Sequence, residues 1–405
     1  MKRSVLLAYA AIFVIALTST AFADSSGRLY GKLTTTDGDV YEGLIRWDKN
    51  EASWTDILNG SKELHRSHSS NRRHERIRVF GITIGERWDS EGDDNVQSGL
   101  CFGHIKKIEP LRSDAVRLTL KSGEKVRLEG GSTDIGDEIR GIVIEDSKEG
   151  EIEFDWDEVE SVELSQGPAG LTSEFGERLY GTMTTRRGDE YTGWVSWDAD
   201  EIFTGDVLDG EYKDHTRKIA FDKIKSIERY SSDGAKLTLA NGDEIVLRET
   251  NDVDDSNRGI AVYDPAIGQV TADWDEFEKL EFKTPPAAIA YDRFDGGRRL
   301  EGTAFTDDGE KHTGAIRWDD DEEFTWEILD GDDRDITFDV EFGNIKEIKP
   351  VGLHGATVTL WDGRSFKLRG TNDVDEDNNG IIVTTSDGKK IEIEWDDVDR
   401  VEFAR

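Results

Sequence analysis

The chain has 405 residues, of which 35% are hydrophobic and 34% are charged, and its formal net charge is −37 at pH 7. A chain of this length divides into roughly two to four domains, and its 41 glycines bring the apolar share close to that of ordinary globular proteins. The composition therefore excludes a wholly disordered chain, and the negative charge argues against binding to nucleic acid or anionic lipid headgroups while it favours cations and basic partners.

The first 23 residues have the three parts of a secretory signal peptide. Lys2 and Arg3 form a basic start, residues 5–16 form an apolar run, and residues 21–23 (AFA) form a small-residue cleavage site. The run is short for a membrane span, and no later run approaches the roughly 20 apolar residues that a span needs. We expect cleavage after Ala23 and an exported chain, periplasmic or extracellular, without a stable membrane span. The alternative is an uncleaved anchor helix.

The rest of the chain repeats one two-part unit three times. An A block, RLYGKLTTTDGDVYEGLIRWDKNE at residues 28–51, returns at residues 178–201 and 299–322, and a B block follows each copy from residues 117, 236 and 357. The period is about 120 residues, which indicates a repeat architecture. The predicted units are repeat 1 (residues 24–165, with an insertion at about 61–99), repeat 2 (177–283) and repeat 3 (298–405), joined by linkers that contain proline.

Both blocks have the pattern of β-hairpins. In each A block, alternating apolar residues flank a turn at Gly38, Gly188 or Gly309, and in each B block they precede a turn such as Ser122-Gly123. No amphipathic helix is evident. The sequence therefore predicts an all-β protein.

Both blocks also end in the same way, with an aromatic residue, a polar pair, two apolar residues three apart and a short strand. The A blocks end from Phe102, Phe221 and Phe342, and the B blocks end from Trp156, Trp274 and Trp395. Five short strands with a single-turn bridge resemble the small SH3-like and Sm-like β-barrels. This resemblance implies a pair of small barrels in each repeat. A six-bladed β-propeller is the alternative. Sm-like proteins bind RNA, but the signal peptide and the acidic charge argue against that role here.

Aspartates two residues apart in the B-block loops are the first candidate site. The loops TNDVDDSNRGI and TNDVDEDNNGI offer carboxylate and hydroxyl oxygens that suit a hard cation such as Ca²⁺, from these residues: Asp252, Asp254, Ser256, Asp373, Asp375 and Asp377. The EF-hand pattern is not met, and an Asx turn that bonds its own backbone is the other interpretation. Repeat 1 has Asp134, Gly136 and Glu138 there, so we expect a degraded site in it.

The motif WDxxE is the second candidate site. It occurs as Trp47-Asp48 with Glu51, as Trp197-Asp198 with Glu201, and as Trp318-Asp319 with Glu322. Paired carboxylates beside an aromatic ring are typical of a glycosidase cleft. An enzyme rarely needs three copies of one active site, so packing of the tryptophan beside an aspartate that opens a turn is the favoured interpretation.

The insertion in repeat 1 carries the only basic cluster of the sequence. The cluster contains five arginines and three histidines, His65, His68 and His74. The spacing of the histidines suits Zn²⁺, but the surrounding positive charges and the lack of a fourth ligand argue against a zinc site. A self-docking basic loop followed by an added hairpin is the favoured interpretation. Cys101 is the single cysteine, so an intramolecular disulfide is excluded. Cys101 and His104 are a weaker metal candidate.

The leading functional hypothesis is an exported, non-catalytic β-repeat protein that acts as a binding or scaffolding module, with a protein or a cell-envelope component as its partner. No Ser-His-Asp arrangement, phosphate loop or HExxH motif supports an enzyme. Weak calcium sites are the one cofactor considered. The alternative is a carbohydrate-active hydrolase that uses a WDxxE carboxylate pair.

Overall fold

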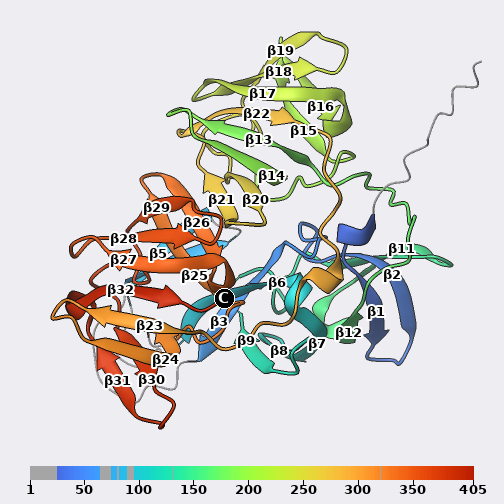
Figure 1. Cartoon of the computed structure of the whole chain (residues 1–405). Helices are drawn as coiled ribbons and strands as arrows, with labels where there is room; N and C mark the ends of the chain where they lie inside the picture. Colours follow the sequence, from blue (N-terminus) through green and yellow to red (C-terminus); the bar gives the residue numbers. More distant parts are fainter. Residues whose placement is uncertain (1–24, 64–73, 80–81, 89–94, 131, 320) are drawn as a thin grey trace, which may run out of the picture.

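The computed structural model describes residues 25–63, 74–79, 82–88, 95–130, 132–319 and 321–405 (Figure 1). The all-β prediction is confirmed, because the regular elements of this part are antiparallel strands and single 3-10 turns. Within it, no helix has the length and apolar character needed to cross a membrane. The predicted signal peptide lies outside the described residues. The 3-10 turns are η1 (Ser25–Gly27), η2 (Phe102–His104), η3 (Trp156–Glu158), η4 (Phe221–Lys223), η5 (Tyr291–Arg293), η6 (Phe342–Asn344) and η7 (Trp395–Asp397).

Repeat 1 forms a ten-stranded antiparallel sheet in the order β11-β10-β2-β1-β12-β7-β8-β9-β3-β6. Its strands are β1 (Tyr30–Thr35), β2 (Val40–Arg46), β3 (Ile57–Glu63), β6 (Asn95–Cys101), β7 (Ile105–Arg112), β8 (Ala115–Leu120), β9 (Lys125–Glu129), β10 (Ile142–Asp146), β11 (Gly150–Phe154) and β12 (Val159–Leu164). The predicted added hairpin is confirmed as β4 (His74–Val79) paired with β5 (Ile82–Trp88).

The A and B blocks are interleaved within each sheet. Strands β1 and β2 of the A block pair with β12 and β10 of the B block, while β3 of the A block pairs with β9. Among the described strands, none of the three large sheets closes into a barrel, so the expected pair of barrels in each repeat is corrected to open sheets that contain strands of both blocks. The described strands do not form six separate four-stranded blades either.

Repeat 2 contributes ten strands to a twelve-stranded sheet in the order β16-β15-β19-β18-β17-β22-β13-β14-β20-β21-β26-β25. Its own strands are β13 (Tyr180–Thr185), β14 (Glu190–Trp197), β15 (Val207–Tyr212), β16 (His215–Ala220), β17 (Ile224–Ser231), β18 (Gly234–Leu239), β19 (Glu244–Arg248), β20 (Ile260–Asp264), β21 (Gly268–Ala272) and β22 (Phe277–Phe282).

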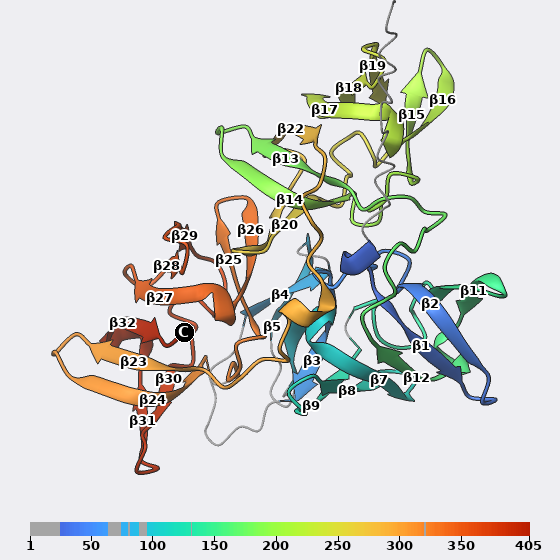
Figure 2. The ribbon, with the colours of Figure 1, turned by 45° about the vertical axis from the view of Figure 1, so that its right-hand side comes forward.

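Repeat 3 is divided between two sheets. Eight of its strands form a sheet in the order β29-β28-β27-β32-β23-β24-β30-β31, and its hairpin β25–β26 extends the sheet of repeat 2 by pairing with β21 (Figures 1 and 2). The strands are β23 (Glu301–Thr306), β24 (Lys311–Trp318), β25 (Ile328–Asp333), β26 (Ile336–Glu341), β27 (Ile345–Pro350), β28 (Ala356–Leu360), β29 (Ser365–Leu368), β30 (Ile381–Thr384), β31 (Lys390–Ile393) and β32 (Val398–Phe403).

The insertion of repeat 1 lies inside a hairpin that all three repeats have. Its β3–β6 pair corresponds to β15–β16 and to β25–β26. Tight turns close the other two hairpins. In the turn between β15 and β16, φ is 50° at Lys213 and 64° at Asp214, the left-handed values that a two-residue hairpin turn requires. The predicted boundaries of the insertion, about 61–99, therefore include residues that belong to the common fold.

Paired tryptophans form the centre of each repeat. Trp47, Trp197 and Trp318 are fully buried and meet Trp156, Trp274 and Trp395 edge to face, with ring centroids 6.2, 6.2 and 6.1 Å apart. One apolar core runs through repeats 2 and 3. A second core fills repeat 1 and includes side chains from both other repeats. The three repeats therefore pack on one another.

Candidate metal centre

The WDxxE motif forms a tight turn directly after β2, β14 or β24. In repeat 1 the Trp47 N–H donates to the Glu51 carbonyl oxygen at 2.7 Å, and the Glu51 N–H donates back to the Trp47 carbonyl oxygen at 3.0 Å. The aspartate adopts φ of 44° at Asp48, 48° at Asp198 and 47° at Asp319. Aspartate tolerates this left-handed conformation better than most residues. The turn directs the aspartate and the glutamate into the protein, where Asp48 is fully buried and Glu51 is 2% exposed.

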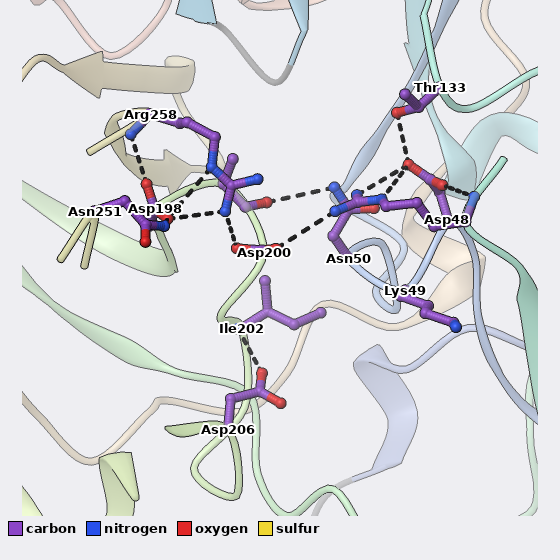
Figure 3. Close-up of polar contacts among 12 residues, drawn as sticks. Asp48, Lys49, Asn50, Thr133, Asp198, Asp200, Ile202, Asp206, Asn251 and Arg258 are labelled. Carbon is purple, nitrogen blue, oxygen red and sulfur yellow. Dashed lines mark hydrogen bonds and ion pairs between the residues drawn. The ribbon is translucent and has the colours of Figure 1, made fainter. Parts of the chain in front are cut away.

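The buried aspartate of each turn binds the end of the B-block loop. Asp48 accepts hydrogen bonds from the Arg140 backbone N–H at 2.6 Å, from Arg140 Nη2 at 2.9 Å and from Thr133 Oγ1 at 2.7 Å. Asp198 accepts the equivalent bonds from the Arg258 backbone at 2.6 Å and from its Nη2 at 2.8 Å (Figure 3). The loop is therefore held to the turn by a charged pair in repeats 1 and 2.

The first aspartate of the B-block loop is fixed by two bonds that all three repeats share. The indole Nε1 of Trp47, Trp197 or Trp318 donates to its carbonyl oxygen at 2.9 Å in every copy. Its carboxylate accepts a backbone N–H from β3, β15 or β25, at 2.7 Å for Asp134, 2.7 Å for Asp252 and 2.8 Å for Asp373. These bonds bring the loop aspartate to the WDxxE turn.

Three carboxylates meet as a result, and we call each such group a carboxylate triad. In repeat 1 the triad is Asp48, Glu51 and Asp134, and in repeat 2 it is Asp198, Glu201 and Asp252, with one oxygen of each residue within 4.8 Å of the other two. Neither oxygen of Glu51 has a hydrogen-bond partner among the described residues, and the same holds for Oδ1 of Asp134 and Oε2 of Glu201. These are buried acceptors directed into an acidic cluster.

Burial raises the pKa of four of the triad carboxyl groups. It raises the pKa of Asp134 and of Asp252 to about 7 and that of Glu201 to about 10. The pKa of Glu51 is raised well above its ordinary value, first by burial and then by the neighbouring Asp134 charge. Groups of this kind either keep a proton at neutral pH or need a cation.

The two triads lie on either side of the interface between repeats 1 and 2. Asp200 stands between them, since it pairs with Arg140 of repeat 1 at 3.4 Å and with Arg258 of its own repeat (Figure 3). Asn50 also donates to the Ala199 carbonyl oxygen at 3.4 Å. A substitution or a bound ion at one triad therefore also affects Asp200 and the arginines beside the other triad.

Repeat 3 differs from this arrangement. Asn379 replaces the arginine, and its side chain donates to Asp319 at 3.0 Å. A lysine of repeat 1, Lys62, reaches the same region and pairs with Glu327 at 2.6 Å. Its positive charge lowers the pKa of Glu322, although burial raises that pKa overall. Within the described part of the chain, the compact triad is found in repeats 1 and 2.

The predicted calcium ligands do not all lie together. Asp252 belongs to a triad, and Asp373 occupies the same place in repeat 3. In contrast, Oδ1 of Asp254 accepts the Ser256 backbone N–H at 2.9 Å, and Oδ1 of Asp375 accepts that of Asp377 at 3.0 Å. The last two pairs have the geometry of an Asx turn.

The Asp loops and WDxxE, which are separate candidates in the sequence, meet in the structure. Gly136 suggests a degraded site in repeat 1. The triad of repeat 1 is complete, since only the first aspartate of the loop, Asp134, enters it. Both motifs recur in every repeat, and this recurrence was the signal in the sequence that they lie together.

The other candidates do not form a metal site in the described residues. His65 and His68 lie outside them, and His74 begins β4. Cys101 is buried near the Thr55 carbonyl oxygen at 3.5 Å, and burial raises the pKa of its thiol. His104 lies 3.5 Å from Glu341 of repeat 3. Glu341 also contacts the Cys101 thiol, so Cys101 and His104 share this neighbour, but among the described residues the three do not form a compact ligand group.

Comparisons of the chain with protein-family models, curated proteins and solved structures gave no match. One arginine offsets one of three carboxylate charges in repeats 1 and 2, which leaves two negative charges when all three groups are ionised. A divalent cation would offset both. Oxygen-only ligands suit hard cations such as Ca²⁺ or Mg²⁺.

Proposed function

We propose that this protein is an exported, non-catalytic β-repeat scaffold or binding module in which the carboxylate triads of repeats 1 and 2 hold Ca²⁺. The observation that carries the proposal is the buried Glu51 carboxylate, which points at Asp48 and Asp134 and has no partner among the described residues. An isolated buried carboxylate is unstable as an anion. A cation at this place removes that cost.

The position of the triads supports a role in holding the fold. Each triad joins the A-block turn, the B-block loop and the edge of β3 or β15, which are segments far apart in the sequence. A cation that binds only the folded arrangement stabilises it by about 2.7 kcal/mol at a hundredfold excess over its dissociation constant. Calcium also accepts carbonyl oxygens and water in flexible geometry, whereas Mg²⁺ demands a regular octahedron. Three carboxylates from separate segments fit calcium better.

The alternative, a hydrolase that uses the WDxxE pair, is less well supported. A glycosidase needs both carboxyl groups beside the sugar ring, but Asp48 is fully buried and Glu51 is 2% exposed. Equivalent burial of Asp198 and Asp319 argues for one structural role repeated three times. The acidic surface favours a basic partner, either a protein or a cell-envelope component.

Calorimetry of the full chain with CaCl₂, after removal of metals by a chelator, tests the proposal. We expect two sites with a dissociation constant on the order of 10⁻⁴ to 10⁻³ M at pH 8. Glu51→Gln and Glu201→Gln should each remove one site, and the matched change Glu322→Gln in repeat 3 should leave both. Binding should release protons and weaken below pH 7, because ligand carboxylates must be ionised.

Absence of heat at millimolar calcium would contradict the proposal and would leave the triads as protonated carboxyl groups. Equal effects of Glu51→Gln and Glu322→Gln would contradict it as well.

A further inference from the structure

A cavity of about 470 Å³ lies between repeats 1 and 2 and is lined by both inter-repeat linkers. Its volume is within the range of roughly 300–1,000 Å³ that is typical of small-molecule sites. Much of its wall is apolar, with contributions from these side chains: Leu44, Leu171, Trp194, Pro286, Ala288 and Ile289. The two linkers and both repeats thus enclose a space suited to an apolar molecule.

Arg28 adds a buried positive charge to this apolar wall. The residue is 7% exposed, and its guanidinium lies 4.1 Å from the ring centroid of Phe203. Its hydrogen bonds are long, at 3.3 Å to the Gly176 carbonyl oxygen and 3.4 Å to Ser173 Oγ, and its Nε has no partner among the described residues. It forms no ion pair among the described residues. Burial lowers its pKa to about 10, although the charges of Glu145 and Asp56 act in the opposite direction.

The equivalent arginines of the other repeats are compensated. Arg178 also lines the cavity, but it pairs with Asp56 at 2.7 Å and donates to Ser53 Oγ at 3.1 Å. Arg299 is exposed and pairs with Glu323. Of the three residues at this place in the repeat, Arg28 alone is both buried and without an ion pair in the described structure. A buried charge in that state is costly unless an anion joins it.

A second polar group in the cavity wall also lacks a partner. Thr55 lines the cavity, and its buried Oγ1 has no hydrogen bond among the described residues. Glu177 lines the cavity too, but its side chain is exposed to water. Among the described residues, the buried part of the wall therefore offers a guanidinium without an ion pair and a hydroxyl without a hydrogen-bond partner, within an apolar surround.

We propose that this cavity binds an amphiphile with an apolar body and a single carboxylate, in which the carboxylate accepts hydrogen bonds from Arg28. A medium-chain fatty acid is the simplest molecule of this class. Arg28 supplies charge-assisted bonds, and the apolar wall covers the chain. The site is separate from the carboxylate triads, so the inference does not depend on calcium.

Calorimetric titration of the full chain with dodecanoate, in a chelator and below the micelle concentration, tests the inference. Dodecanoate should bind one site per chain, and 1-dodecanol, which keeps the apolar body without the charge, should bind at least roughly tenfold more weakly. Arg28→Met should weaken dodecanoate by a similar factor. The matched control Arg299→Met should bind as the wild type does.

A second variant keeps the test independent of any folding defect in Arg28→Met. Thr172 is an exposed linker residue that lines the cavity, so Thr172→Trp should block it while Arg28 stays in place. Loss of dodecanoate binding in both variants supports the inference. Equal binding of dodecanoate and dodecanol, unchanged binding in Arg28→Met, or no binding at millimolar dodecanoate would overturn it.

Discussion

Replacing Asp134 by asparagine should change how the stability of repeat 1 depends on pH. Burial raises the pKa of this carboxyl from 3.8 to about 7, which corresponds to roughly 4 kcal/mol. The folded state keeps the proton to higher pH than the unfolded state does. The stabilisation is therefore complete below pH 3.8 and is lost as the pH rises through 7.

Between pH 5 and pH 8, in a chelator, the wild type should lose roughly 3 kcal/mol of local stability from this group. Asp134→Asn has no such titration and should not show this loss, while its remaining oxygen still accepts the Asn59 N–H. Hydrogen exchange of the segment 47–59 reports the local opening free energy. Saturating calcium should return roughly 2.7 kcal/mol to the wild type at pH 8 and nothing to the variant.

Asp137→Asn is the matched control, because Asp137 is an exposed aspartate of the same loop. It should follow the wild type at both pH values and with calcium. The reasoning is refuted if Asp134→Asn keeps the pH dependence and the calcium response of the wild type.

Three further results are expected from the contacts between and within repeats. Arg178→Met breaks a buried ion pair and should lower the free energy of unfolding by about 3–5 kcal/mol, whereas exposed Arg299→Met should cost less than about 1 kcal/mol; similar urea midpoints for the two would contradict this. In a fragment of residues 298–405, the edge of β26 that β21 covers in the full chain is exposed. Scattering should therefore show that this fragment self-associates, whereas a fragment of residues 177–405 should not. A stable monomer of residues 298–405 would count against this expectation. Residues 64–94 can be replaced by Lys-Asp, which is the turn between β15 and β16. This variant should keep a β-type circular dichroism spectrum and cooperative unfolding. Loss of the cooperative unfolding transition would mean that repeat 1 needs its insertion.

The local parts of the fold were predictable because they depend on neighbouring residues. Alternating apolar residues predicted the hairpins, and the turn glycines Gly38, Gly188 and Gly309 have φ of 90°, 88° and 91°, values that glycine adopts without strain. The interleaving of A and B blocks was not predictable in this way. Alternation fixes which face of a strand is buried, but it does not specify which distant strand pairs with it.

The candidate site was predictable in its residue types and only partly in its grouping. The spacing of Asp252 and Asp254 suggested that both bind one ion, but side chains two residues apart in a loop need not share a direction. The tryptophan bond to the Asp252 carbonyl fixes that residue, while Asp254 bonds to Ser256. Two motifs that recur together in every repeat are a better indication of spatial contact than spacing within one loop.

The edge-to-face tryptophan pairs have an optical consequence. Indole rings whose centroids lie about 6 Å apart are close enough for their electronic transitions to couple, and coupled chromophores in a chiral arrangement produce paired circular dichroism bands of opposite sign. The interplanar angles are 85°, 84° and 82°, so the three pairs have nearly the same geometry and their bands reinforce one another. Opening of one repeat would remove about a third of this signal, which makes the ultraviolet spectrum a direct count of intact repeats.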